Sequence, residues 1–251
     1  TAKPKQVQGF GPTQKPIEYP IYLESITSYY LPRFYGQTHF ADLSTDPSND
    51  TMNSGTDINI TFNGSLRDEQ KPIQQLFLDE KGGGIISLKC GGGKTVLALS
   101  IIAELKKKTI VLVHKDFLMT QWRDRILEFL PDAKIGKIQQ DTIDIDNKDI
   151  VLAMVQSISM KEYPKEVFNQ FGLAVFDECH HLGAEVFFKC MPKVASKYML
   201  GLSATPKRKD GLQWVFEAFI GPIVYQTKEV TTEGVEVNII DYYSDDENYS
   251  K

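Results

Sequence analysis

Short apolar runs recur along the chain, at residues 85–88, 109–113, 150–154, 173–176 and 198–202. Unbroken runs of this length are typical of strands that are covered on both faces, as in a parallel sheet. Two segments between these runs, residues 96–105 and 117–130, carry apolar side chains at helical spacing instead, and Pro131 ends the second. The alternation of the two patterns predicts an α/β fold with a mostly parallel sheet and helices on both faces.

The region before the first run has a different pattern. Residues 1–16 are mostly Pro, Gly, Gln and Lys, which predicts an extended arm. Residues 17–36 are dense in aromatic and β-branched side chains interrupted by prolines, so we expect a small β-rich accessory region. Its aromatic side chains, together with Arg33, could stack on nucleic-acid bases or pack against the main domain, and the sequence leaves both open.

Three further elements are predicted between this region and the first apolar run. Residues 42–57 are rich in Ser, Thr, Asp and Asn and predict a surface loop. Residues 58–62 alternate between apolar and polar positions and predict a short strand. A helix is expected over residues 66–79, and its apolar face is predicted to consist of Ile73, Leu76 and Phe77.

A glycine turn joins the strand at 85–88 to the helix at 96–105. We call residues 88–95, Leu-Lys-Cys-Gly-Gly-Gly-Lys-Thr, the phosphate loop. Backbone N–H groups of such a turn can hold phosphates, Lys94 would supply a mobile cation for β- and γ-phosphates, and Thr95 would offer a hydroxyl to Mg²⁺. The alternative is a flexible glycine loop that precedes a helix by chance. The residues predicted to contact the nucleotide are Cys90, Gly91, Gly92, Gly93, Lys94 and Thr95.

Gln70 lies on the helix that is predicted to precede the phosphate loop. Its amide has a donor and an acceptor, as the N6 and N7 edge of adenine requires. A solvent-facing helical glutamine accounts for the residue equally well, so the sequence leaves both interpretations open.

Asp177 and Glu178 follow the run at 173–176, and open α/β sheets bind their ligands at such strand ends. The first carboxylate can hold Mg²⁺ and the second can activate the attacking water, so Lys94, Asp177 and Glu178 are the predicted catalytic residues. A plain surface turn is the alternative. Cys179, His180 and His181 are metal-ligating types, but consecutive residues do not converge easily on one ion.

Other polar residues at the strand ends suggest coupling and nucleic-acid contacts. The hydroxyls of Ser203 and Thr205 are predicted to bond the carboxylates or His180, which would couple nucleotide state to a moving element. A basic run at residues 207–209 could be solvated or could reach phosphates. The residues predicted to touch a nucleic-acid backbone are His114, Lys115, Gln156, Ser157 and Arg208.

The composition adds limits to this picture. The chain of 251 residues has a net charge of −5, so nucleic-acid binding would need a local basic patch. Its 3 cysteines predict reduced intracellular thiols rather than a disulfide framework. We find neither a signal peptide nor an apolar stretch of the ~20 residues that cross a bilayer, so we expect a soluble intracellular protein without membrane contact.

The segments Gly-Gly-Gly-Lys-Thr (91–95), Asp-Glu-Cys-His (177–180) and Ser-Ala-Thr-Pro (203–206) resemble motifs I, II and III of superfamily 2 helicases in order and spacing. The Cys-Gly-x-Gly-Lys form of the phosphate loop, Leu66-Arg67 followed by Gln70, and the Gln121-Trp122 pair resemble the XPB-like branch, including its archaeal and large-DNA-virus relatives. The resemblance extends over residues 62–225. It implies ATP and Mg²⁺ as cofactors, and it places Arg67 as well as Gln70 at the nucleotide.

The same resemblance implies a RecA-like first motor domain that unwinds or moves along nucleic acid by closing against a second such domain. We therefore expect an accessory region at residues 1–60, a RecA-like domain at 61–230 and a linker at 231–251. About two dozen residues follow Tyr225, so the second domain is expected in a longer protein, and hydrolysis by this chain alone is expected to be slow. Expected partners are DNA, with RNA as the alternative, and transcription or repair machinery; the rival hypothesis is a nucleotide-dependent scaffold without unwinding.

Overall fold

The computed structural model describes residues 20–40, 52–80, 82–164, 166–178, 184–204 and 211–227. The strands within these ranges are β1 (Leu23–Glu24), β2 (Tyr29–Tyr30), β3 (Gly83–Ser87), β4 (Thr109–Val113), β5 (Ile135–Gln139), β6 (Thr142–Asp144), β7 (Ile150–Met154), β8 (Leu173–Phe176), β9 (Tyr198–Ser203) and β10 (Ile223–Gln226). The helices are α1 (Arg33–His39), α2 (Gln70–Asp79), α3 (Lys94–Leu105), α4 (Asp116–Phe129), α5 (Val155–Met160), α6 (Glu166–Asn169), α7 (Ala184–Cys190), the 3₁₀ helix η4 (Met191–Lys193) and α8 (Gln213–Ile220). None of these helices combines the length and apolar character needed to cross a membrane.

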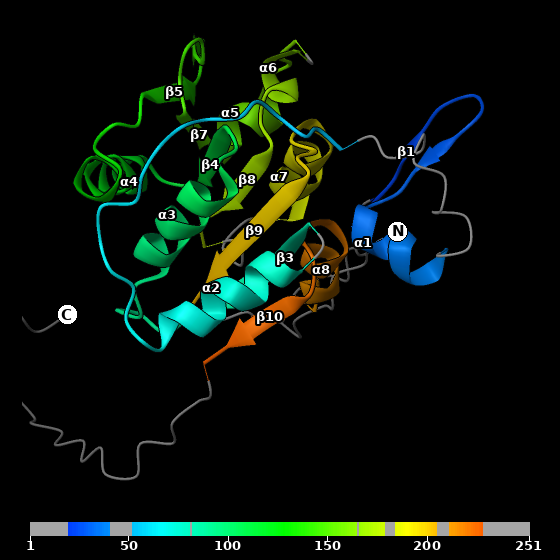
Figure 1. Ribbon diagram of the computed structural model, residues 1–251. Helices are drawn as coiled ribbons and strands as arrows, with labels where there is room; N and C mark the ends of the chain where they lie inside the picture. The colour runs from blue at the N-terminus through cyan, green and yellow to red at the C-terminus, as the bar shows by residue number, and fades with distance from the viewer. Residues whose placement is uncertain are drawn as a thin grey trace, which may run out of the picture.

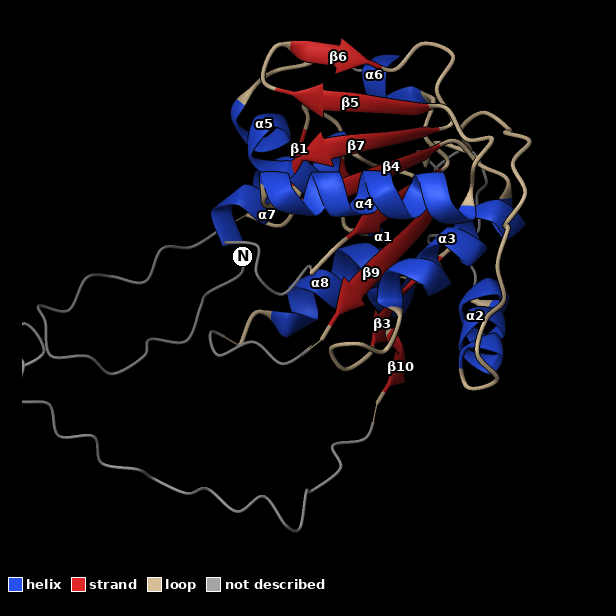
Figure 2. Cartoon of the chain, turned by 90° about the vertical axis from the view of Figure 1, so that its left-hand side faces the viewer, coloured by secondary structure: helices blue, strands red, loops and turns tan. Residues whose placement is uncertain are grey.

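The main sheet has eight strands in the order β10-β3-β9-β8-β4-β7-β5-β6 (Figure 2). All neighbouring strands in it pair parallel except β5 and β6, which form an antiparallel edge. The predicted mostly parallel α/β sheet is therefore confirmed. Parallel strands end at one edge, so the residues that follow β3, β4, β8 and β9 come close together there.

Helices cover both faces of this sheet (Figure 1). Alternate residues of one strand belong to opposite cores: Ile110 and Leu112 of β4 lie in one buried cluster, and Val111 and Val113 lie in the other. Because successive side chains of a strand point to opposite faces, burial of both faces requires an unbroken apolar run. One cluster includes residues of α2, α3 and α4, and the other includes residues of α5, α7 and α8.

The strand that leads to the phosphate loop, β3, begins with two glycines, Gly83 and Gly84. A Cβ atom on Gly83 would lie 2.2 Å from the carbonyl oxygen of Ile220, and one on Gly84 would lie 2.5 Å from Cγ1 of Val224. The close approach of α8 and β10 to β3 thus requires glycine at both positions.

Two predicted elements before the sheet are wrong in detail. Residues 58–62 form no strand; Ile60 is buried and the Phe62 ring stacks on Phe129 of α4, so the alternating side chains pack on helices rather than on a sheet. Helix α2 begins at Gln70, four residues later than residue 66, and Leu76 on it is 46% exposed while Ile73 and Phe77 are buried.

The accessory region contains a small hairpin and a helix. β1 and β2 pair antiparallel, whereas Arg33, within the segment expected to be β-rich, begins helix α1 directly after its N-cap residue Pro32. Helix α1 packs against α8, and Arg33 donates a hydrogen bond of 2.7 Å to the carbonyl of Lys197 (Figure 1). Packing against the main domain is therefore observed for α1, whereas Tyr29 and Tyr30 of the hairpin are exposed.

Candidate nucleotide-binding site

The phosphate loop runs from the end of β3 to the start of α3, as predicted. Gly91 and Gly93 have φ angles of +76° and +75°, in the left-handed region where a side chain would be strained. Gly93 immediately precedes α3, so the first N–H groups of this buried helix face the loop. This backbone has the conformation that a phosphate site needs.

Gln70, the first residue of α2, forms hydrogen bonds to the phosphate loop. Its side-chain carbonyl accepts a hydrogen bond of 3.0 Å from the Arg67 N–H, and its amide donates to the carbonyls of Gly92 (3.0 Å) and Gly93 (3.3 Å). The residue is 3% exposed, so the solvent-facing interpretation is wrong. Hydrogen bonds to the loop are its observed contacts, and adenine recognition stays a prediction.

Lys94 and Glu178 meet across the loop. Lys94 Nζ lies 2.6 Å from Glu178 Oε1, and both side chains are largely buried. Glu178 has a φ of +49°, an unusual conformation for a residue with a side chain and one found at functional sites. Its second oxygen accepts a hydrogen bond of 3.2 Å from the backbone N–H of Ala204, directly after β9. Glu178 is thus joined to both the phosphate loop and the predicted coupling segment.

The Asp177 side chain is held by Trp122, for which the sequence patterns predicted no contact with this carboxylate. Trp122 of α4 is 1% exposed and donates from Nε1 to Asp177 Oδ2 at 2.8 Å. Burial raises the pKa of the Asp177 carboxyl, and the Trp122 hydrogen bond partly opposes this rise. A buried tryptophan usually donates its N–H to a hydrogen-bond acceptor. This requirement is the one feature of the sequence that could have indicated a polar partner for Trp122.

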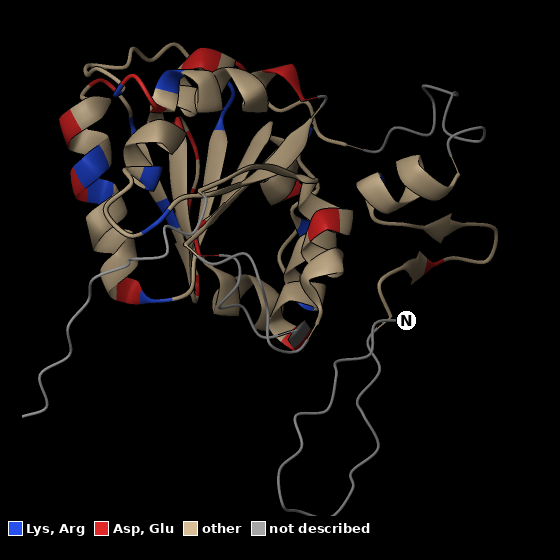
Figure 3. Ribbon diagram, turned by 90° about the horizontal axis from the view of Figure 1, so that it is seen from below, with Lys and Arg blue, Asp and Glu red and all other residues tan. Residues whose placement is uncertain are grey.

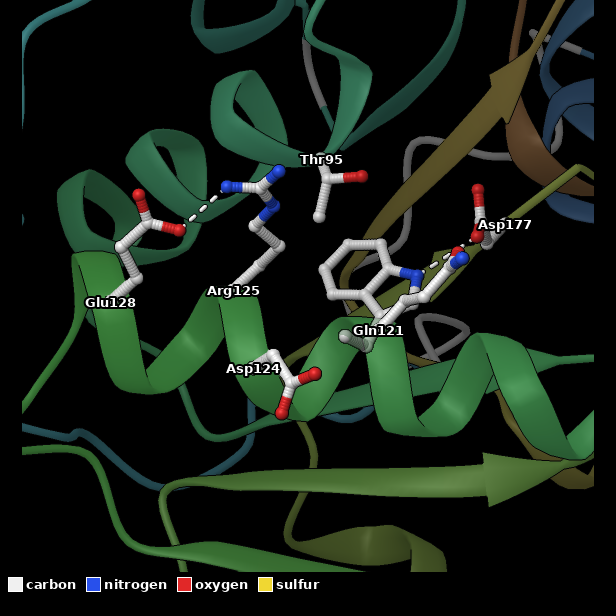
Figure 4. A pocket seen from close by; sticks show the side chains of 7 residues that line it. Thr95, Gln121, Asp124, Arg125, Glu128 and Asp177 are labelled. Atoms are coloured by element: carbon white, nitrogen blue, oxygen red, sulfur yellow. Dashed lines mark hydrogen bonds and ion pairs between the residues drawn. The ribbon is translucent and has the colours of Figure 1, made fainter.

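Two cavities adjoin these residues. We call the first, of about 410 Å³, the loop cavity; its lining residues are Arg67, Lys89, Gly91, Gly92, Gly93, Lys94, Thr95, Val96 and Arg125. We call the second, of about 510 Å³, the α4 cavity, and Figure 4 shows its lining residues, Thr95, Gln121, Trp122, Asp124, Arg125, Glu128 and Asp177. Thr95 and Asp177 bring a hydroxyl and a carboxylate to one cavity, which is the oxygen donor set that Mg²⁺ prefers.

Of the predicted coupling residues, Ser203 lies within the described part of the chain. Ser203 is fully buried at the end of β9, and its carbonyl accepts a hydrogen bond of 3.0 Å from the Leu88 N–H. A link from this segment to Glu178 is the hydrogen bond that the Ala204 backbone N–H donates to Oε2. The other predictions for these segments lie outside the described residues: Cys179, His180, His181, Thr205 and Arg208.

The other residues predicted to contact a nucleic-acid backbone lie just after the carboxyl ends of β4 and β7. Gln156 donates to the backbone carbonyl of His114 at 2.9 Å, and Ser157 accepts from the N–H of Gln140 at 3.0 Å. Lys115 is exposed and precedes α4. Gln156 and Ser157 therefore hold the backbone at this edge, and Lys115 presents a cation to solvent.

The two cysteines within the described ranges carry free thiols. Cys90 is exposed in the phosphate loop, whereas Cys190 is buried in α7. Burial raises the pKa of Cys190 to about 12, so this thiol stays protonated at neutral pH.

Residues 63–208 match the model of the family described as "Type III restriction enzyme, res subunit" (ResIII). A putative ATP-dependent RNA helicase of Acanthamoeba polyphaga mimivirus is 33% identical over 97% of this chain and 47% of its own length. The DNA 3'-5' translocase XPB2 of Sulfurisphaera tokodaii is 38% identical over 64% of this chain and 35% of its own length. The chain thus spans half or less of the length of these relatives.

Solved structures agree with the fold. The UvsW helicase of bacteriophage T4 superposes with a TM-score of 0.57 at 20% identity, over 68% of this chain and 64% of that chain. The SWI2/SNF2 ATPase core of Sulfolobus solfataricus, in complex with double-stranded DNA, gives a TM-score of 0.54 at 20% identity, over 66% and 37%. The expected resemblance to superfamily 2 helicases is confirmed. Because the family match extends over more than half of its residues, the chain belongs to the ResIII helicase family, with XPB-like and large-DNA-virus helicases as its relatives.

Proposed function

We propose that the chain is the ATP-binding half of an ATP-dependent nucleic-acid helicase or translocase. The observation that carries the proposal is the convergence of Lys94, Thr95, Asp177 and Glu178 at one edge of the sheet, beside a cavity lined by cationic side chains. Phosphate-binding backbone, a mobile cation and two carboxylates are the parts that phosphoryl transfer requires. The half-length match supports a role for a second domain, which we propose completes the site.

In this proposal Lys94 changes partner when ATP binds. A phosphate oxygen replaces Glu178 Oε1 as the acceptor of the Lys94 ammonium group, and the Glu178 carboxylate becomes available to accept a proton from water. The Ala204 N–H keeps the second carboxylate oxygen in place during this change. Thr95 and Asp177 would hold Mg²⁺, which would supply positive charge to balance the charge that develops on the phosphates.

Several assignments are proposals that rest on the sequence. We propose the division into an accessory region (1–60), a RecA-like domain (61–230) and a linker (231–251), and a coupling role for His180, Ser203 and Thr205. We also propose that the edge beside β4 and β7 faces the nucleic-acid backbone, with Lys115 as its described cation. Lysine and arginine are spread among acidic positions on the outer helices, which favours a local contact over a uniformly basic face (Figure 3).

DNA is the proposed substrate, with transcription or repair as the setting. The archaeal relative named as a DNA translocase supports this assignment, whereas the viral relative named as a putative RNA helicase supports RNA. Contacts to phosphates do not distinguish the two sugars. The competing hypothesis is a nucleotide-dependent scaffold that binds nucleic acid without moving along it.

The substrate is tested by ATP hydrolysis at fixed salt with single-stranded DNA, duplex DNA or RNA added. We expect slow hydrolysis by this chain alone, and strong stimulation by DNA once the chain is joined to a second RecA-like domain, because an added arginine finger is worth about 10³-fold. Stimulation by RNA alone would reassign the substrate. Unstimulated hydrolysis by the joined protein would favour the scaffold, and rapid stimulated turnover by this chain alone would refute the need for a second domain.

Replacing Trp122 with phenylalanine is expected to weaken Mg²⁺ binding by about 10-fold, as loss of a hydrogen bond to a metal ligand typically does. The ring still fills the core, but Asp177 loses its 2.8 Å donor. The Trp122 hydrogen bond lowers the pKa of Asp177, so its loss makes the carboxyl easier to protonate. The loss of Mg²⁺ affinity in the variant should therefore grow as the pH falls. The measurement is the Mg²⁺ concentration that gives half-maximal ATP binding.

The matched control for this variant is Trp214→Phe, at a tryptophan of α8 that is 40% exposed. Both variants should retain the wild-type circular dichroism spectrum. An unchanged Mg²⁺ requirement in Trp122→Phe would show that the tryptophan packs in the core without positioning Asp177.

A further inference from the structure

Arg125 is a cation that lines both cavities beside the phosphate loop. It lies on α4 between Trp122 and Ile126, which are 1% and 0% exposed and fix the helix against the core. Figure 4 shows its side chain extending from α4 toward the start of α3, where Thr95 lies. Thr95 and Arg125 are the residues that the loop cavity and the α4 cavity share.

The loop cavity has an excess of positive charge. Arg67, Lys89, Lys94 and Arg125 line it, and no Asp or Glu occurs among its described lining residues. This concentration of cations stands out in a chain with a net charge of −5. Three of these four cations pair with carboxylates that lie outside this lining, at Glu178, Glu128 and Glu69. A polyanion that enters the cavity would therefore compete with these carboxylates for the cations.

Arg125 forms an exposed ion pair that it can exchange for another partner. Its Nη1 lies 2.6 Å from Glu128 Oε2, one helical turn further along α4, and both side chains are 53% exposed. Exposed pairs of this kind contribute little to stability, because solvent screens them and ordering two long side chains costs entropy. A guanidinium group loses little when it exchanges such a carboxylate for phosphate, which it binds with two parallel N–H donors.

We propose that Arg125 is a nucleotide-binding residue that donates to a phosphate oxygen of the bound triphosphate, and that Glu128 is its partner when no nucleotide is bound. The proposal rests on the proposed function, since it concerns the same ATP site. It adds a third element, α4, to the phosphate loop and to the strand end at Asp177. Thr95 lines both cavities, so the contact is expected near the phosphate that Lys94 would bind and the Mg²⁺ that Thr95 would hold.

The test is an equilibrium titration of the 251-residue chain with ATP, and separately with tripolyphosphate, which has the three phosphates without ribose or base. Arg125→Ala is expected to weaken binding of both probes by about 10-fold, the effect of one lost charged hydrogen bond. Glu128→Gln is expected to tighten binding by about 2-fold, because Arg125 is released, and to have no effect in the Arg125→Ala background.

The matched control is Arg123→Ala, which removes the same charge from an exposed position of the same helix outside both cavities. It should change the affinity by less than about 2-fold, because exposed charges at a distance are screened. Equal losses in Arg123→Ala and Arg125→Ala would reduce the effect to overall charge and overturn the proposal.

The outcomes separate this proposal from the proposed function. If the wild-type chain binds ATP and Arg125→Ala binds it equally well, the Arg125 contact is refuted while the proposed function stands. If Arg125→Ala loses affinity for ATP but not for tripolyphosphate, the contact is to ribose or base and the phosphate assignment is wrong. If the folded wild-type chain binds neither probe, the proposed function itself fails.

Discussion

Replacing Glu178 with glutamine is expected to slow single-turnover ATP hydrolysis by at least about 100-fold, the usual contribution of a general base. An amide has nearly the same shape as a carboxylate but cannot accept the proton of the attacking water. It can still accept the hydrogen bond from the Ala204 N–H, so the local backbone should stay in place. The measurement is the release of phosphate from ATP held in the presence of excess protein.

ATP binding should survive this change and even improve. The Glu178 carboxylate forms an ion pair with the Lys94 ammonium group, with Oε1 2.6 Å from Nζ. A neutral glutamine competes less with phosphate for that cation. The control is Glu185→Gln on α7, whose exposed carboxylate pairs with Lys189 at 2.7 Å and should leave hydrolysis unchanged. Hydrolysis by Glu178→Gln at the wild-type rate would exclude Glu178 as the base.

The central strands could be predicted from sequence because burial on both faces dictates their pattern. The runs at 109–113, 150–154 and 173–176 coincide with β4, β7 and β8 residue for residue. The antiparallel edge formed by β5 and β6 was missed, because exposed positions in β5 and throughout β6 remove the need for an apolar run. Sequence patterns therefore located the core of the sheet and overlooked its edge.

The candidate site divides in a similar way. The phosphate loop and Asp177-Glu178 were predictable because their chemistry is local to a few residues at strand ends. The Trp122–Asp177 hydrogen bond joins residues 55 positions apart, and the role of Gln70 depends on how α2 lies against the loop. Such contacts are set by packing between elements, which local patterns do not encode.

Replacing Lys94 with alanine is expected to lower the affinity for ATP by about 100-fold, because the phosphates lose a charge-assisted donor in a largely buried site. The same change removes the ion pair between Lys94 and Glu178, so the Glu178 carboxylate is left near the phosphates without this cation between them. The lost attraction to Lys94 and the repulsion by Glu178 both weaken ATP binding. Lys189→Ala, an exposed lysine on α7, is the control and should bind as the wild type does.

We propose that the phosphate loop binds ATP through Lys94, with Mg²⁺ held by Thr95 and Asp177. The decisive experiment is an equilibrium titration of the wild-type chain and of Lys94→Ala with ATP, at saturating Mg²⁺ and again in excess chelator. We expect one saturable site in the wild type, which weakens without Mg²⁺ and is nearly lost in the variant. Equal binding by the two folded proteins, or binding unaffected by Mg²⁺, would show that ATP is not bound in this way.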